Sequence, residues 1–177
     1  MPIIATAGAD SANYTPAPAG VHPAVCVDVI DKGIVDVAGF NGGPPKKKHM
    51  VSVAWQIPEL RDDGKRYVIY RRYNLTLNEK AALRKDLESW RGRPFSREEE
   101  MGFDVEKLIG VNCLLNIQHR PSGDKVYANV VSIMPLVKGM PKMVAEGYVR
   151  EEATASNGSE PDEPEPPVQI TDDDIPF

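Results

Sequence analysis

Basic and aromatic side chains recur together in several short stretches of this 177-residue sequence. Lysine and arginine neutralise phosphates, and the flat faces of tyrosine and phenylalanine accept stacked bases, each worth about 1–3 kcal/mol. The side chains with this chemistry are Lys46, Lys47, Lys48, Arg66, Tyr67, Tyr70, Arg71, Arg72, Tyr73, Arg91, Arg93, Phe95, Lys125 and Tyr127. Because most of them lie on or beside predicted strands, the sequence predicts a groove that binds single-stranded nucleic acid with little base readout.

Members of this set also have structural alternatives. The lysine run can be a solvated loop, and Arg91 and Arg93 can complement the negative C-terminal end of a preceding helix. Residues 67–73 form a strand whose two faces each carry an aromatic ring and an arginine, so Tyr67 or Tyr73 can belong to the core. The sequence leaves open which face points inward, and we expect several members of the set to contact nucleic acid.

The sequence lacks the residue patterns of catalytic and metal sites. Its three histidines lie in separate segments, and no HxE, HExxH, Walker or GxGxxG motif occurs. Cys26 and Cys113 stand alone in strand-like runs, which predicts buried reduced thiols and neither zinc nor a disulfide. We expect a non-catalytic protein without cofactor or metal; carboxylates brought together by folding would leave a metal-dependent nuclease as an alternative.

Stretches rich in Val, Ile and Tyr predict five strands, separated by turn-forming segments such as AGFNGGPP, RDDGK and PSGDK. The strands are expected at residues 21–31, 46–58, 65–77, 111–120 and 126–136. In the second strand, valines, Trp55 and Ile57 alternate with small or polar residues at 52, 54 and 56. This period of two predicts a strand with one buried face, with Trp55 in the core.

The hydrophobic period changes between the third and fourth strands. Leu83, Leu87 and Trp90 recur at helical spacing within residues 78–92, where Gly92 supplies a stop. Helix starts are indicated by Thr76 with Glu79, by Ser96 with Glu99, and by Asp104.

Five antiparallel strands with a helix between the third and fourth have the order of the OB-fold, a small barrel that commonly binds single strands. The expected fold is therefore all-β with one or two helices, a five-stranded OB-fold barrel followed by a disordered acidic C-terminal tail. Other small barrels and open sheets share this strand order. We expect a flexible N-terminal segment (1–19), the OB-fold domain (20–145), a disordered acidic linker (146–171) and a terminal tip (172–177).

Charge is divided unevenly along the chain. All 21 lysines and arginines lie in residues 1–150 with 17 acidic residues, a net charge of +4, whereas residues 151–177 hold nine acidic residues and no basic one. Such a split favours a body that accepts an anion and a tail that seeks a basic surface. With no apolar run long enough for a membrane span and no secretory start, we expect a soluble intracellular protein.

The last six residues, DDDIPF, resemble the C-terminal tip of bacterial single-stranded DNA-binding proteins. LRKDLESWRGRPF and GVNCLLNIQH resemble phage-encoded single-stranded DNA-binding proteins of OB type. The resemblance implies cytoplasmic, nucleoid-associated action in a bacterial host cell and docking of the tip on replication, recombination and repair proteins. The tip residues are Asp172, Asp173, Asp174, Ile175, Pro176 and Phe177.

The insertion SREEEMGFDVEKLIG departs from the bacterial tetramer-forming pattern, so a tetramer is in doubt and a homodimer is the oligomer we consider. The expected function is a non-catalytic protein that coats and protects single-stranded DNA during replication or recombination and recruits partners through its tip. The alternatives are a strand-annealing factor on the same fold, an RNA-binding module and a metal-dependent nuclease.

Overall fold

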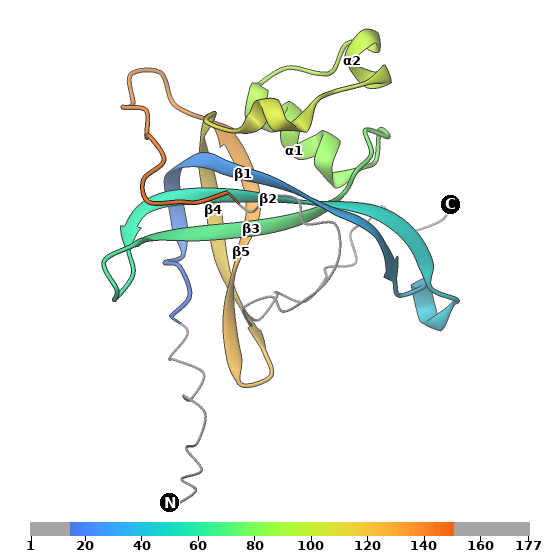
Figure 1. Ribbon diagram of the computed structural model, residues 1–177, viewed down its shortest axis with the longest axis horizontal. Helices are drawn as coiled ribbons and strands as arrows, with labels where there is room; N and C mark the ends of the chain where they lie inside the picture. The colour runs from blue at the N-terminus through green and yellow to red at the C-terminus, as the bar shows by residue number, and fades with distance from the viewer. Residues whose placement is uncertain (1–14, 151–177) are drawn as a thin grey trace, which may run out of the picture.

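The chain folds as an antiparallel sheet of five strands with two α-helices beside it, as described for residues 15–150 of a computed structural model (Figure 1). In chain order the elements are β1 (Gly20–Val37), the 3-10 helix η1 (Phe40–Gly42), β2 (Lys46–Leu60), β3 (Arg66–Asn74), α1 (Ala82–Arg91), α2 (Arg97–Met101), the 3-10 helix η2 (Val105–Leu108), β4 (Asn112–Ser122) and β5 (Lys125–Pro135). The five strands and the helical connection between the third and fourth agree with the sequence prediction.

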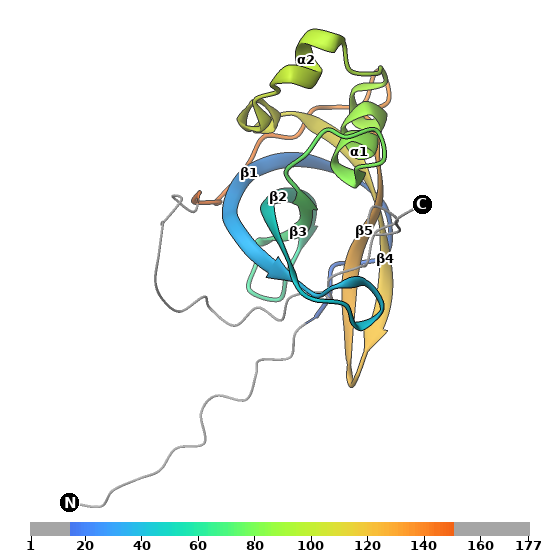
Figure 2. The ribbon, with the colours of Figure 1, turned by 90° about the vertical axis from the view of Figure 1, so that its right-hand side faces the viewer.

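The strands are ordered β3-β2-β1-β4-β5, and every neighbouring pair is antiparallel. The first residues of β1 pair with β4, and the rest of β1 pairs with β2. Figure 2 shows β1 curling around β2 and β3, and its two β-bulges are the local cause because an extra residue bends a strand. The edge strands β3 and β5 are linked where Arg71 Nη1 donates a 2.9 Å hydrogen bond to the carbonyl of Val130.

The main core lies between the inner face of the sheet and α1. Leu83, Leu87 and Trp90 are the buried residues of α1, and the ring of Trp90 lies 6.0 Å from that of Trp55 on β2. The expected core position of Trp55 is therefore confirmed. Trp90 Nε1 also donates to the carbonyl of Asn112, so the helix is fixed to the start of β4 as well. Both cysteines are buried and free, as the sequence predicts.

β2 is buried on both faces, whereas its alternating pattern predicted one solvated face. All residues from Val51 to Ile57 are buried. The outer face of β1, β2 and β3 carries a second apolar cluster that includes Ala54 and Tyr70, and Met143 and Tyr148 pack on it. Residues 143–150, which follow β5, therefore cover part of a face that the sequence pattern left to water.

Polar contacts hold this covering segment in place. The side-chain amide of Gln56 accepts from Glu146 N at 2.8 Å and donates to its carbonyl at 2.6 Å. Asn112 makes the same reciprocal pair with the backbone of Met143. The carboxylate of Asp28, which is fully buried, accepts hydrogen bonds from Tyr148 and Arg150. Residues 146–150, expected as the start of a linker, are thus bound to the sheet; the rest of that linker, the tip and residues 1–14 lie outside the described residues.

The helix boundaries differ from the prediction at one place. α1 begins at Ala82 with Ala81 as a cap that makes no side-chain bond, and Thr76 instead accepts from Asn78 N within a turn. The predicted capping box at Thr76 and Glu79 therefore does not start the helix. Three other signals are confirmed: Gly92 ends α1 in the left-handed conformation, Ser96 and Glu99 form a reciprocal capping box, and Asp104 caps η2.

Candidate nucleic-acid interface

A surface hollow lies where the start of β2, the end of β3 and the connection to α1 meet. Its lining includes lysine, histidine, asparagine and threonine side chains and consists of Lys48, His49, Asn74, Leu75, Thr76, Asn78, Glu79, Lys80 and Ala81. Ammonium, amide and hydroxyl groups are hydrogen-bond donors to phosphate oxygens, and Glu79 supplies the one carboxylate. The hollow thus has the chemistry of a site for a phosphate-bearing chain.

Backbone hydrogen bonds connect the walls of this hollow. Leu75 N donates to His49 O at 2.8 Å, so the chain leaving β3 is fastened to β2. Thr76 N donates to Asn74 O and Ala81 N to Asn78 O, which makes the connection two successive turns. The walls are thereby positioned by main-chain bonds.

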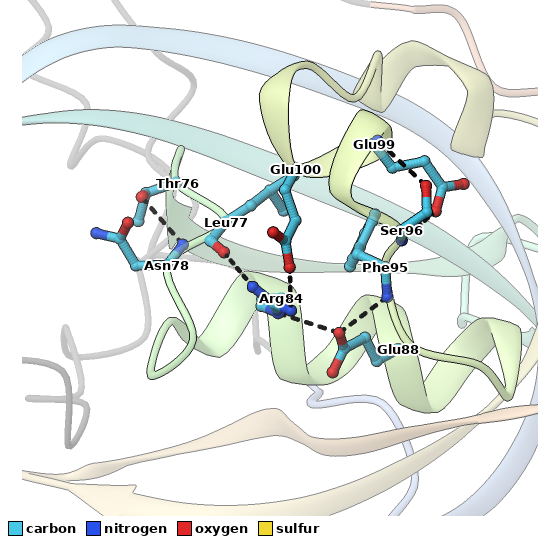
Figure 3. A network of polar contacts seen from close by, with 9 residues as sticks. All are labelled: Thr76, Leu77, Asn78, Arg84, Glu88, Phe95, Ser96, Glu99 and Glu100. Atoms are coloured by element: carbon cyan, nitrogen blue, oxygen red, sulfur yellow. Dashed lines mark hydrogen bonds and ion pairs between the residues drawn. The ribbon is translucent and has the colours of Figure 1, made fainter.

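Arg84 of α1 binds the same connection through Leu77 (Figure 3). Its guanidinium donates to the carbonyl of Leu77 at 3.1 Å and makes ion pairs with Glu88 at 3.0 Å and with Glu100 of α2 at 2.6 Å. Glu88 Oε1 also accepts from Phe95 N, and that bond together with Arg84 holds the pKa of Glu88 below its usual range. One side chain thus joins the loop of the hollow to both helices, which makes Arg84 a positioning residue.

The opposite wall is braced at the second bulge of β1. His49 Nε2 lies 2.6 Å from Asp31 Oδ1, and the same carboxylate oxygen accepts from Gly33 N at 2.7 Å. The bond from Gly33 and then the bond to His49 hold the pKa of Asp31 below its usual range. Gly33 has a positive φ of 69°, a conformation that favours glycine.

The outer face of β3 carries Arg66, Tyr70 and Arg72, half of the strand's predicted binding residues. Arg72 is exposed and stands opposite Ser52 of β2, one outward position before Asn74 of the hollow. Tyr70 packs in the second apolar cluster. Arg66 donates to the carbonyl of Val144 and pairs with the Glu146 carboxylate at 2.8 Å, so it holds the covering segment.

The inner face of β3 carries Tyr67, Arg71 and Tyr73, which settles the question that the sequence left open. Tyr73 is buried at 3% exposure, and its hydroxyl donates to Asp86 of α1 at 2.7 Å. Arg71 lies 3.1 Å from the same carboxylate and 5.2 Å from the Tyr73 ring centre. Tyr67 packs against the main core. Arg71 and Tyr73 therefore connect the sheet to α1, and none of the three side chains lines the hollow.

Arg91 and Phe95, also in the predicted set, belong to the packing of the helical connection. The guanidinium of Arg91 lies over the Phe95 ring at 4.7 Å and donates to Glu99 at 2.6 Å, and Phe95 is buried. This bond from Arg91, with the backbone bond of Ser96, lowers the pKa of Glu99 to about 2. Arg93 is exposed, 3.6 Å from Glu99.

The remaining predicted residues lie on two projecting hairpins. Lys46 and Lys47 are exposed at the start of β2, and Lys47 lies 3.9 Å from Asp36. Lys125 is exposed and Tyr127 half-buried at the start of β5, in the β4–β5 hairpin at the bottom of Figure 1. The structure therefore brings Lys48 to the hollow with Arg72 nearby, and distributes the other predicted residues elsewhere.

Sequence reasoning missed part of the hollow, namely Asn74, Thr76, Asn78 and Lys80. The signal was present as a run of turn-forming and polar residues directly after β3, but Thr76 and Glu79 were interpreted as a helix cap. Arg84 was missed because a charged residue on a predicted amphipathic helix has no sequence mark of a positioning role.

Within residues 15–150 no helix is long and apolar enough to cross a membrane, and no three His, Cys, Asp or Glu side chains are placed to hold a metal ion. No protein-family profile matches the chain, and no curated protein sequence matches it. The candidate function therefore follows from the residues themselves.

Proposed function

We propose that the protein is a non-catalytic single-stranded DNA-binding protein. In this proposal the bound DNA lies over the hollow between β2, β3 and the connection to α1. The observation that carries the proposal is the gathering of Lys48, His49 and Lys80 with amide and hydroxyl donors in that one hollow. Arg72 extends the cationic surface along the outer face of β3. Lysine contacts to phosphates are indifferent to base identity, which favours binding with little sequence readout.

The proposal includes an OB-type barrel. Its support is the strand order with β3 and β5 as edges, the curl of β1, and the hydrogen bond from Arg71 of β3 to Val130 of β5. In an OB-fold the face of the second and third strands and the adjoining loops bind oligonucleotides. The hollow adjoins those two strands.

The proposal extends to residues 151–177, whose role rests on sequence alone. Residues 172–177 would recruit replication, recombination and repair proteins: Phe177 supplies an apolar anchor and Asp172 to Asp174 attract a basic rim. A pull-down with full-length protein and a Phe177→Ala variant tests this part. Unchanged partners would reduce the tail to a solubilising segment.

The test of DNA binding is a fluorescence-anisotropy titration with labelled oligo-dT and a duplex of equal length at several salt concentrations. An extrinsic label is needed because Trp55 and Trp90 are both buried in the core. The full-length protein should prefer the single strand, and its affinity should fall as salt rises. Equal affinity for the duplex would refute the proposal.

Matched lysine variants place the binding surface. Lys48→Gln and Lys80→Gln should each weaken binding and reduce the slope of log affinity against log salt by about 0.7, the value for one lost phosphate contact on a single strand. Lys107→Gln, an exposed lysine on η2, is the control and should leave the slope unchanged. Parallel assays of strand annealing, RNA preference and magnesium-dependent cleavage distinguish the alternative functions.

A further inference from the structure

β1 and β2 extend beyond the rest of the sheet as a two-stranded arm. We define the arm as residues 31–50, in which Val37 pairs with Lys46, Val35 with Lys48 and Ile34 with His49. Pairing of β2 with β3 stops at Met50, and pairing of β1 with β4 stops at Val25, so within residues 15–150 the arm has no further strand on either side (Figure 1). The arm projects away from the core and ends in η1.

The arm tip is a tightly specified turn. A Cβ at Gly39 would lie 2.3 Å from the carbonyl oxygen of Gly43, so only glycine fits there. Asn41 has a φ of 50° and Gly42 a φ of 77°, and Gly43 N donates to Phe40 O at 3.0 Å. Non-glycine residues at positive φ carry a conformational cost and persist where the surroundings impose them. The backbone of the arm tip therefore fixes the direction in which the Phe40 side chain leaves the chain.

Phe40 is 41% exposed, and among residues 15–150 every other aromatic residue is buried or half-buried. A single exposed apolar residue is ordinary by itself. The surroundings of Phe40 are not ordinary, because Lys46, Lys47 and Lys48 begin the strand that leaves this turn. Counting Lys32 as well, the arm carries four lysines against two aspartates, a net charge of +2.

We propose that Phe40 is a stacking residue for an unpaired base, held at the arm tip while Lys46 and Lys47 meet the adjoining phosphates. The inference rests on the proposed function and adds to it a second contact, at the far end of the arm from the Lys80 side of the hollow. The charge of the arm disfavours contact with the same arm of a second copy, since two cationic arms repel each other, and it attracts a polyphosphate.

Stacking and charge neutralisation leave different signatures in a salt titration, which allows each residue to be assigned. Removal of a stacked ring lowers affinity at every salt concentration and leaves the slope unchanged, because no counterion is released at the ring. Removal of a lysine reduces the slope by about 0.7. Phe40→Leu keeps an apolar side chain but removes the aromatic face, and Phe40→Trp enlarges that face.

The experiment compares oligo-dT binding by full-length wild type, Phe40→Leu, Phe40→Trp, Lys46→Gln and the control Ile34→Ala. Ile34 is 71% exposed on the same arm and has no ring. Phe40→Leu should weaken binding about 5- to 150-fold, the range for one stacked base, with the slope unchanged. Phe40→Trp should bind at least as tightly as wild type, Ile34→Ala within about twofold of it, and Lys46→Gln with the smaller slope.

If wild type binds and Phe40→Leu binds equally well, the stacking role is overturned and the proposed function stands. If wild type shows no preference for single strands, both fall together. Light scattering is run on each variant. Loss of a dimer in both Phe40→Leu and Ile34→Ala would overturn the proposal and identify the arm tip as a self-association surface. Circular dichroism checks that every variant is folded, so that weakened binding can be assigned to the lost side chain of the arm tip.

Discussion

Arg71 and Arg72 are consecutive arginines on opposite faces of β3, and their exchange for alanine should give opposite results. Arg71 pairs with Asp86 and donates to Val130 O, so Arg71→Ala leaves a carboxylate without its cation between sheet and helix. Breaking a buried pair on one side costs about 3–5 kcal/mol. Because the two side chains remain 21% and 16% exposed, water offsets part of this, and we expect about 2–3 kcal/mol of destabilisation.

At about 4 °C per kcal/mol for a domain of this size, Arg71→Ala should lower the melting temperature by about 8–12 °C. Arg72→Ala, on the exposed face, should change stability by less than about 0.5 kcal/mol and weaken DNA binding instead. Thermal melts and anisotropy titrations of both variants are the assay. A stable Arg71→Ala protein, or an Arg72→Ala protein that unfolds, would refute the assignment of the two faces.

The pH dependence of Arg71→Ala gives a second measurement. Burial holds the pKa of Asp86 above its usual range even with Arg71 and the Tyr73 hydroxyl acting to lower it. A raised folded-state pKa means that the protonated acid is favoured in the folded protein, so the ionised carboxylate lowers stability as pH rises through that pKa. The penalty of Arg71→Ala should therefore be smaller near pH 4 than at pH 7. An equal penalty at both values would contradict the role assigned to Asp86.

Three further predictions concern the framework around the candidate interface. Gln56→Ala removes both hydrogen bonds to the Glu146 backbone and should lower the free energy of unfolding by about 1–2 kcal/mol in urea denaturation. Limited proteolysis near residues 143–150 should become faster, and unchanged proteolysis would contradict the role of Gln56 in holding the covering segment. Glu99 has a pKa lowered to about 2 in the folded protein, so the stability gap between wild type and Glu99→Gln should be full above about pH 4.5 and close as pH falls towards 2, as measured by thermal melts. Burial raises the pKa of Cys26 to about 12 and that of Cys113 further, so neither thiol should react with Ellman's reagent at pH 8 until urea is added.

The sequence predicted most of the sheet because its strands carry local signals. The period of two in the valines around Trp55 specifies a strand. Gly92 specifies the end of α1 through its left-handed backbone, and the Ser96–Glu99 pair specifies the start of α2 through its hydrogen bonds to the backbone. The burial of β2 on its second face could not be predicted in this way. It depends on residues about ninety positions away, and a segment held by side-chain amides of Gln56 and Asn112 has no strand period to reveal it.

The candidate site was harder to predict because the type of a residue does not specify which other residues it contacts. Tyr73 and Arg71 have the same composition signal as Tyr70 and Arg72, and only the parity of β3 relative to the core separates them. Sequence alternation gave two equivalent faces, each with a ring and an arginine. The carboxylate of Asp86, on a different element, is what commits Arg71 to the interior.

Coverage of the outer face of the sheet restricts the path of the single-stranded DNA that we propose to bind there. Across β1, β2 and β3 the outward positions form rows, and the row containing Gln56 and the row containing Ala54 are met by the segment that includes Glu146 and Tyr148. The next rows towards the arm pair Ser52 with Arg72 and Met50 with Asn74, and Asn74 lines the hollow. With residues 143–150 in place, single-stranded DNA on this face would therefore run from Arg72 towards the hollow and the arm rather than across the end of the sheet that carries Gln56. The fold thus favours the same path that the lysines of the hollow favour by charge, and the two arguments are independent because one depends on burial and the other on chemistry.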